Sequence, residues 1–271
     1  MVAHQKAVGI VGCGAIAQVL LRAGENRDLP FRFSGVCSRT EAKARTFLKT
    51  LAHVPPPLLD LPALIACSDL IVETAGAHVV PVLARLAFEA GKDLMVISVG
   101  ALLEHPEVIE HARRTGCRLI VPSGAIAGLD GIKGACMGRV DFVRLTSRKP
   151  PRALEGAPYL TARGLSVLGL AEERELFRGS AREACKGFPD NLNVSAAISL
   201  AGIGPDLTEV RIIAAPGLER NCHDIEVEGE FGRLAVHIEN IPSQNPRTGR
   251  LTALSILRSI IDASSTVRIG T

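Results

Sequence analysis

The sequence is poor in aromatic residues, with no tryptophan, one tyrosine (Tyr159) and eight phenylalanines among 271 residues. It has no long basic run, and its formal net charge is only +3. Proteins that bind nucleic acids present a clustered basic face or aromatic stacking platforms, so we expect no nucleic-acid partner. Hydrophobic residues make up 47% of the chain but aromatic residues only 3%, so the core must be aliphatic. An aliphatic core is typical of a sheet covered by helices on both faces.

Metal sites and membrane segments are also missing. The seven cysteines form no C-x-x-C pair, and no Cys/His cluster has zinc spacing, so we expect no metal and free thiols in the reducing cytoplasm. The apolar run Ala7–Leu21 follows Lys6 as in a signal peptide, but spaced glycines interrupt it, which argues against secretion. No stretch approaches the ~20 apolar residues of a membrane span, so we expect no membrane association.

The first 122 residues alternate between short apolar runs typical of buried strands and segments with helical spacing of apolar residues. The expected strands are Ala7–Val11, Phe31–Cys37, Leu70–Glu73, Asp93–Val99 and Arg118–Val121. The expected helices lie between them, at residues 16–23, 41–48, 61–67, 78–90 and 107–115. This alternation predicts a parallel sheet with helical crossovers over residues 1–122.

The pattern changes after Pro122. The expected strands are Val140–Ser147, Val210–Ala214, Asp224–Gly229 and Leu234–Ile241, and the expected helices are residues 125–137, 180–186 and 193–201. This order predicts a second, α+β domain with a mostly antiparallel sheet over residues 123–246. We expect a C-terminal helix, at about residues 247–271, to pack back on the first domain.

A glycine motif follows the first strand and opens the first helix. Gly12 to Ala17 form the pattern G-x-G-x-x-A, in which Gly12 permits the tight turn and Gly14 lets the backbone approach a pyrophosphate. The helix start at Ala15 and Ile16 supplies amide groups and a favourable dipole for the phosphates. The first domain is therefore predicted to be a Rossmann domain that binds NADP or NAD, within an α/β protein.

The end of the second strand bears on the choice of cofactor. An NAD-selective site usually carries an acidic residue there, whereas this chain has Ser38 and Arg39, which suit a 2′-phosphate. Arg39 as a solvated cation and Glu41 as a ribose ligand remain alternatives. Ala75 and Gly76, after the third strand, are expected to line the same cleft.

His223 is the candidate for acid–base chemistry. It lies at the start of an expected strand of the second domain, and a histidine titrates near neutral pH, as general acid–base catalysis requires. From its position alone, a solvated loop histidine is an equally good interpretation.

Several stretches resemble the L-aspartate dehydrogenase family, in the same order and over nearly the whole chain. They are Val11–Ile16, Val96–Leu102, Ser123–Asp130, Arg148–Pro150, Asn191–Ala197 and Asn221–His223. The S-V-G-A-L and N-x-N-V-S-A patterns within them are more specific than the glycine motif, which many unrelated enzymes share.

The resemblance implies reversible NAD(P)-dependent oxidation of L-aspartate to iminoaspartate, which yields oxaloacetate and ammonia, in NAD biosynthesis or aspartate catabolism. It assigns His223 as the catalytic histidine, and Ala127 and Asn193 as cofactor contacts. We expect the substrate carboxylates to bind Arg148 and Lys149, although a basic pair beside prolines is also typical of a solvated turn. Asn191 either faces the site or caps the next helix. We expect the substrate to be a small molecule. We also expect the chain to form a homo-oligomer, namely a dimer.

Two other functions fit the same two-domain build. One is another reductase, acting on dihydrodipicolinate or an aspartate-derived aldehyde. The other is a non-catalytic regulatory protein that senses nicotinamide cofactors. The separate second domain and His223 favour an enzyme.

Overall fold

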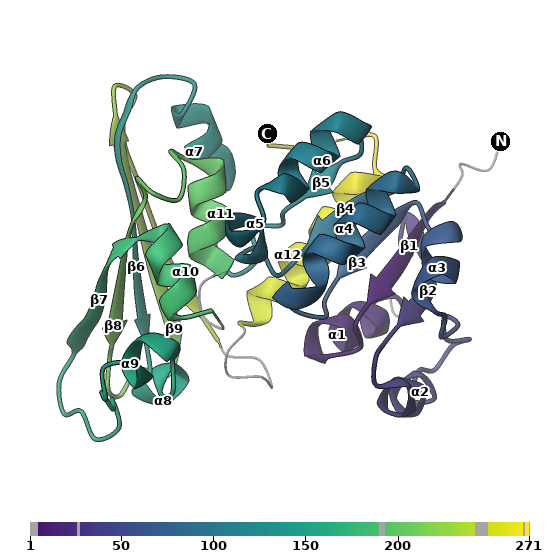
Figure 1. Cartoon of the computed structure of the whole chain (residues 1–271), viewed down its shortest axis with the longest axis horizontal. Coiled ribbons are helices and arrows are strands. Elements are labelled where there is room, and N and C mark those ends of the chain that lie inside the picture. The colour runs from purple at the N-terminus through teal and green to yellow at the C-terminus, as the bar shows by residue number, and fades with distance from the viewer. Residues whose placement is uncertain (1–4, 26–27, 190–192, 242–248, 268, 271) are drawn as a thin grey trace. The chain divides into compact units, whose positions relative to one another are not determined.

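The structure is a computed structural model that describes residues 5–25, 28–189, 193–241, 249–267 and 269–270. The chain divides into two compact units (Figure 1). Unit 1 comprises Met1–Pro122 and Ser255–Arg268, and unit 2 comprises Ser123–Leu254 and Ile269–Thr271, each for its described residues. None of the helices in the described residues is both long and apolar enough to cross a membrane.

Unit 1 is built on a parallel five-stranded sheet with the order β2-β1-β3-β4-β5. Its strands are β1 (Lys6–Val11), β2 (Phe31–Cys37), β3 (Leu70–Glu73), β4 (Asp93–Val96) and β5 (Leu119–Ile120). The parallel sheet confirms the predicted class. β4 ends three residues earlier than expected, because the amides of Ile97 and Ser98 donate to the carboxylate of Glu73.

Helices cover both faces of this sheet (Figure 1). They are α1 (Ala15–Ala23), α2 (Glu41–Leu48), α3 (Leu61–Ala66), α4 (Val80–Glu89), α5 (Ala101–Glu104), α6 (Glu107–Thr115) and the greater part of α12 (Arg250–Ser264), with a 3-10 turn, η1 (Ala77–Val79). Alternate residues of the strands, such as Val8 and Val72, pack with Leu20 of α1 and Ile256 and Ile260 of α12 in one buried cluster. The sequence thus builds a two-sided aliphatic core.

Unit 2 contains a second five-stranded sheet, with the order β10-β9-β6-β8-β7. Its strands are β6 (Val140–Lys149), β7 (Arg174–Ser180), β8 (Glu209–Ala214), β9 (Asn221–Gly229) and β10 (Gly232–Asn240). The β6–β8 pair is parallel, and the β9–β10, β6–β9 and β7–β8 pairs are antiparallel, so the prediction of a mostly antiparallel sheet is confirmed. The sequence does not predict β7. Phe177 is the one buried side chain of this strand, so the alternation of apolar and polar residues that marks a strand is lost.

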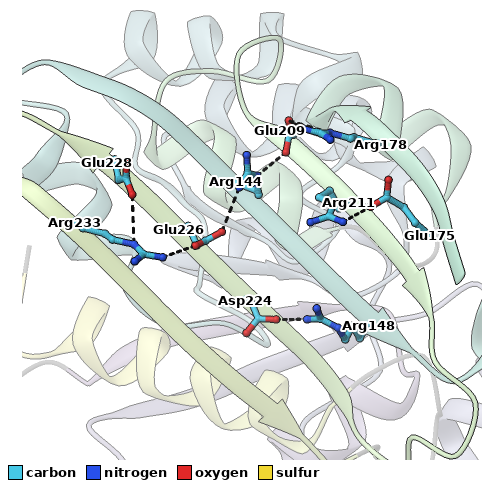
Figure 2. A network of polar contacts seen from close by, with 10 residues as sticks. All are labelled: Arg144, Arg148, Glu175, Arg178, Glu209, Arg211, Asp224, Glu226, Glu228 and Arg233. Carbon is cyan, nitrogen blue, oxygen red and sulfur yellow. Dashed lines mark hydrogen bonds and ion pairs between the residues drawn. The ribbon is translucent and has the colours of Figure 1, made fainter. Parts of the chain in front are cut away.

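The two faces of this sheet differ in chemistry. Helices α7 (Leu129–Ala135), α10 (Ala181–Gly187) and α11 (Asn193–Ala201) lie on one side of it, while α8 (Pro151–Leu154) and α9 (Pro158–Thr161) follow β6 (Figure 1). Arginines and acidic residues pair across neighbouring strands on the other face, as between Arg144 and Glu209 and between Arg233 and Glu226 (Figure 2). Because successive side chains of a strand alternate between faces, each strand contributes to both surfaces.

Candidate active site

A cavity of 770 Å³ lies at the carboxyl ends of β1, β2 and β3 in unit 1. It brings together five residues that the sequence predicts for the cofactor, and these are Gly12, Gly14, Ser38, Arg39 and Ala75. Ala15 and Ile16 begin α1 directly after Gly14, and Gly76 follows Ala75. In open parallel sheets, ligands bind outside the carboxyl ends of the strands, so the cavity occupies the place where a dinucleotide is expected.

Gly12 and Gly14 are glycines for different reasons. Gly12 has φ 105°, and a Cβ there would lie 2.7 Å from the carbonyl oxygen of Thr74. Thr74 is fixed in that position because its backbone N–H and its hydroxyl both donate to the carbonyl of Val11, at 2.8 and 2.9 Å. The conformation of the protein itself therefore requires glycine at position 12.

No described neighbour requires glycine at position 14. Its φ is −82°, which any residue adopts, and a Cβ there would have no described protein atom within 4 Å. Gly14 is also the N-cap of α1 and supplies no side-chain cap to the first amides of the helix. Open space beside bare helix amides fits an anionic group that approaches the backbone closely, as a pyrophosphate does.

The end of the cavity next to β2 is basic. Arg39 and Lys43 both line it and are exposed, and neither forms an ion pair with another described residue. The two acidic residues nearby have partners of their own. Glu41 pairs with Arg45 at 3.2 Å, and Asp60 caps α3 by accepting from the amide of Ala63 at 2.8 Å. Lys43 was not singled out in the sequence, where it reads as an ordinary solvated helix residue.

A second group of polar residues is buried in unit 2. His223 on β9 and Ser147 on β6 are register partners, and the Oγ of Ser147 lies 2.9 Å from Nδ1 of His223. Lys149 follows Ser147 by two residues, and Asn221 precedes His223 by two, so all four belong to the same face of the sheet. Each is at most 5% exposed. This group interrupts an otherwise apolar row, which includes Leu145, Ile225 and Val227.

Burial sets the charge of this group. Burial lowers the pKa of Lys149 to about 8, which leaves it mainly an ammonium ion at neutral pH. Burial, and then the charge of Lys149, lower the pKa of His223 to about 3, although Asp224 opposes this shift. At neutral pH the imidazole of His223 is therefore uncharged, with a pKa well below the near-neutral value that the sequence alone predicts.

Other predicted site residues lie elsewhere. Arg148 is on the opposite face of the sheet from His223, where it pairs with Asp224 (Figure 2) and with Glu173 at 3.7 Å. Ala127 lies just before α7 and Asn193 begins α11, and both are exposed residues of unit 2. Asn191 lies outside the described residues.

Ser147 was missed in the sequence although a signal for it exists. The predicted strand ends at Ser147 itself, whereas β6 continues to Lys149, so the prediction does not place these two residues on one face. Extending the alternation by two residues places Ser147 and Lys149 together.

Comparisons with known proteins cover both units. Residues 130–263 match the family model of the aspartate dehydrogenase C-terminal domain, and residues 12–122 match that of the homoserine dehydrogenase NAD-binding domain. L-aspartate dehydrogenase 3 of Bordetella bronchiseptica is 44% identical over 265 residues, which cover 97% of each chain. The chain belongs to the L-aspartate dehydrogenase family. The predicted resemblance to this family is thus confirmed.

Two further relatives support this assignment. The L-aspartate dehydrogenase of Methanosarcina mazei is 42% identical over 97% of this chain and 99% of that protein. The crystal structure of aspartate dehydrogenase from Thermotoga maritima has a TM-score of 0.75 and 26% identity, over 98% of this chain and 100% of that one. The match to an NAD-binding domain also confirms the predicted nicotinamide cofactor, NADP or NAD.

Proposed function

We propose that this member of the L-aspartate dehydrogenase family oxidises L-aspartate to iminoaspartate with NADP or NAD, and that iminoaspartate is hydrolysed to oxaloacetate and ammonia. In this proposal unit 1 holds the dinucleotide and unit 2 holds the amino acid. The observation that carries it is the buried group of His223, Ser147 and Lys149 in unit 2, which joins a neutral base to a cation on an apolar face.

The cavity of unit 1 would hold the cofactor. The backbone at Gly12 and Gly14 and the first amides of α1, at Ala15 and Ile16, would bind the pyrophosphate. When bound, the oxidised nicotinamide supplies the acceptor for the hydride from Cα of the substrate. Ala127 and Asn193 remain predicted contacts of the cofactor, as the family resemblance implies.

His223 would act as the base. The ammonium group of L-aspartate must lose a proton before its nitrogen can assist loss of the hydride, so an acceptor is required at that atom. Because Nδ1 of His223 is engaged by Ser147, Nε2 is the nitrogen that can face the substrate. The hydroxyl of Ser147 both donates and accepts, so it can support either imidazole tautomer. The same pair can therefore serve the forward and reverse directions.

Lys149 would bind a carboxylate of the substrate. A buried ammonium ion is unfavourable in an apolar face, and a carboxylate bound beside it offsets part of that desolvation. A dicarboxylic amino acid supplies such a group. We no longer assign this role to Arg148, because its side chain lies on the opposite face and is paired with Asp224. Asn191 remains a predicted substrate contact.

The basic end of the cavity favours NADP. Arg39 offers a planar set of donors, Lys43 adds a second cation, and Ser38 and Thr40 add hydroxyls, all of which suit a 2′-phosphate. Glu41 is paired with Arg45, which makes it a weaker candidate for a ribose hydroxyl.

The cellular setting is a further part of this proposal. We predict a cytoplasmic homodimer that supplies iminoaspartate for NAD biosynthesis or degrades aspartate. None of the seven cysteines, all of which lie in the described part of the chain, forms a disulfide, as is typical of a reducing compartment. Light scattering coupled to size-exclusion chromatography tests the dimer, and a monomeric mass would contradict it.

Product analysis tests the activity itself. Purified protein incubated with L-aspartate and either dinucleotide should form ammonia and oxaloacetate in equal amounts, and neither product should form without the dinucleotide. Absence of both products with NADP and with NAD would refute the proposal.

A further inference from the structure

The last residue of β3 is a buried carboxylate to which the proposed function assigns no role. Glu73 is completely inaccessible to solvent, and it stands between the strand and the loop of Thr74 and Ala75 that lines the cofactor cavity. A second unassigned feature is Ser98, within the family-like stretch Val96–Leu102 after β4. The structure joins these two features.

Glu73 accepts five hydrogen bonds from two loops. Its Oε1 accepts from the amides of Ala75 and Gly76, both at 2.7 Å, and from the hydroxyl of Ser98 at 3.1 Å. Its Oε2 accepts from the amides of Ile97 and Ser98, at 3.2 and 2.9 Å. The four amides can only donate, and each carboxylate oxygen accepts from two of them, so both oxygens act as acceptors, as those of an ionised carboxylate do.

The position of these loops bears on ligand binding. Both loops leave the carboxyl ends of adjacent parallel strands, where ligands bind in sheets of this kind. The first loop turns at Gly76, with φ 112°, into η1, and it carries cavity-lining residues on both sides of the turn, namely Thr74, Ala75, His78 and Val79. A displacement of the Glu73 carboxylate would therefore move one wall of the cavity.

If Glu73 served only to complete the fold at the end of β3, its side chain would not need a charge. Burial of a carboxylate is unfavourable unless many donors compensate it, and an apolar residue ends a buried strand without that requirement. A carboxylate with five donors instead fixes the two loops relative to one another, because hydrogen bonds to a charged group are stronger than neutral ones. The arrangement gives a preformed wall for the cofactor.

We infer that Glu73 is a positioning residue for the dinucleotide, which holds the loops after β3 and β4 in the geometry that binds it. This inference rests on the cofactor site of the proposed function. It also explains why Ser98 occurs in the family-like stretch, since both its amide and its hydroxyl bind Glu73.

Glu73→Gln tests the inference. Glutamine keeps the shape of the side chain, but its NH₂ group replaces an acceptor that faces donors, so at least two of the five bonds are lost. We expect the Kd of NADP and NAD, measured by isothermal titration calorimetry, to rise about tenfold or more. Ser98→Ala removes one bond only and should raise the Kd by a smaller factor. Glu89→Gln, at an exposed ion pair with Arg85 on α4, is the matched control and should leave the Kd unchanged.

The outcomes separate three cases. If Glu73→Gln binds NADP and NAD with the wild-type Kd, Glu73 is a merely structural residue and the inference is overturned, whether or not the melting temperature falls. If Glu73→Gln does not fold, Ser98→Ala decides, and an unchanged Kd in that variant overturns the inference. Failure of the wild-type protein to bind either dinucleotide would instead refute the proposed cofactor site itself.

Discussion

Ser147 and His223 are partners across the β6–β9 strand pair, and the Ser147 hydroxyl lies 2.9 Å from Nδ1 of the imidazole. Both side chains are buried, so water does not compete for this contact. The hydrogen bond therefore fixes the ring orientation of a histidine that burial keeps neutral. An oriented, uncharged imidazole can accept a proton, and a substrate carboxylate beside Lys149 would offset the charge that lowers the pKa of His223 and bring this pKa closer to the working pH.

Replacement of this base should affect turnover and not cofactor binding. His223→Ala is expected to lower kcat by ~10²–10⁴ because general base catalysis is lost, while the Kd of the dinucleotide stays the same. Ser147→Ala should lower kcat less, since the ring remains. The control is His237→Ala, an exposed histidine on β10 paired with Asp224, which should retain full activity. Steady-state kinetics and calorimetry measure both quantities, and a fully active His223→Ala enzyme would exclude His223 as the base.

Lys149→Met should weaken substrate binding and stabilise the fold. Loss of the ammonium is expected to raise the KM for L-aspartate about tenfold or more. The pKa of Lys149 is about 8 in the folded protein against 10.5 for the free side chain, so the folded state disfavours the charge. This unfavourable contribution is present below pH 8 and disappears above pH 10.5.

Urea denaturation near neutral pH should therefore show a gain of about 1–3 kcal/mol in the unfolding free energy of Lys149→Met. The control is Arg148→Met on the opposite face, which should leave the KM unchanged. An unaltered KM in Lys149→Met would remove Lys149 from the substrate site.

Gly14→Ala should separate cofactor binding from stability. The added methyl meets no described protein atom within 4 Å, so the melting temperature should hardly move. The same methyl would occupy the space that a pyrophosphate needs, and the Kd of the dinucleotide should rise about tenfold or more. Gly134→Ala in α7 is the control, because its Cβ also meets no described atom and it should alter neither dinucleotide binding nor activity. Equal affinities for Gly14→Ala and wild type would argue against a pyrophosphate at this turn.

Arg39→Asp should change the preference between the two cofactors. The variant replaces the guanidinium, a hydrogen-bond donor, with a carboxylate, an acceptor, beside the proposed 2′-phosphate. The ratio of the Kd for NADP to the Kd for NAD should therefore rise about tenfold to a hundredfold. Arg39 is exposed and has no ion pair with described residues, so thermal stability should not change. If the ratio stays at the wild-type value, the 2′-phosphate interpretation is wrong.

Local patterns were sufficient to predict most of the framework. The bounds of β2 and β3 agree with the apolar runs Phe31–Cys37 and Leu70–Glu73, because each run ends at a polar or turn residue. Gly12 and Gly14 could be predicted as well, since their role depends on the adjacent strand and helix. These features are short-range, and the sequence displays them directly.

Features that depend on distant partners could not be predicted. Arg148 and Lys149 look equivalent as a basic pair, yet β6 continues through both, so they point to opposite faces of the sheet. The role of Glu73 depends on Ser98, which is 25 residues away in sequence. Such relationships are set by strand register and by loop packing, which no local pattern encodes.

The most direct test of the account is the choice of substrate. Initial rates of cofactor reduction, followed by the near-ultraviolet absorbance of the reduced nicotinamide, should be measured with L-aspartate, L-glutamate and L-malate in separate reactions. The account predicts reduction with L-aspartate and none with the other two acids, for at least one of NADP and NAD. No reduction with L-aspartate, or a faster rate with L-glutamate or L-malate, would contradict it.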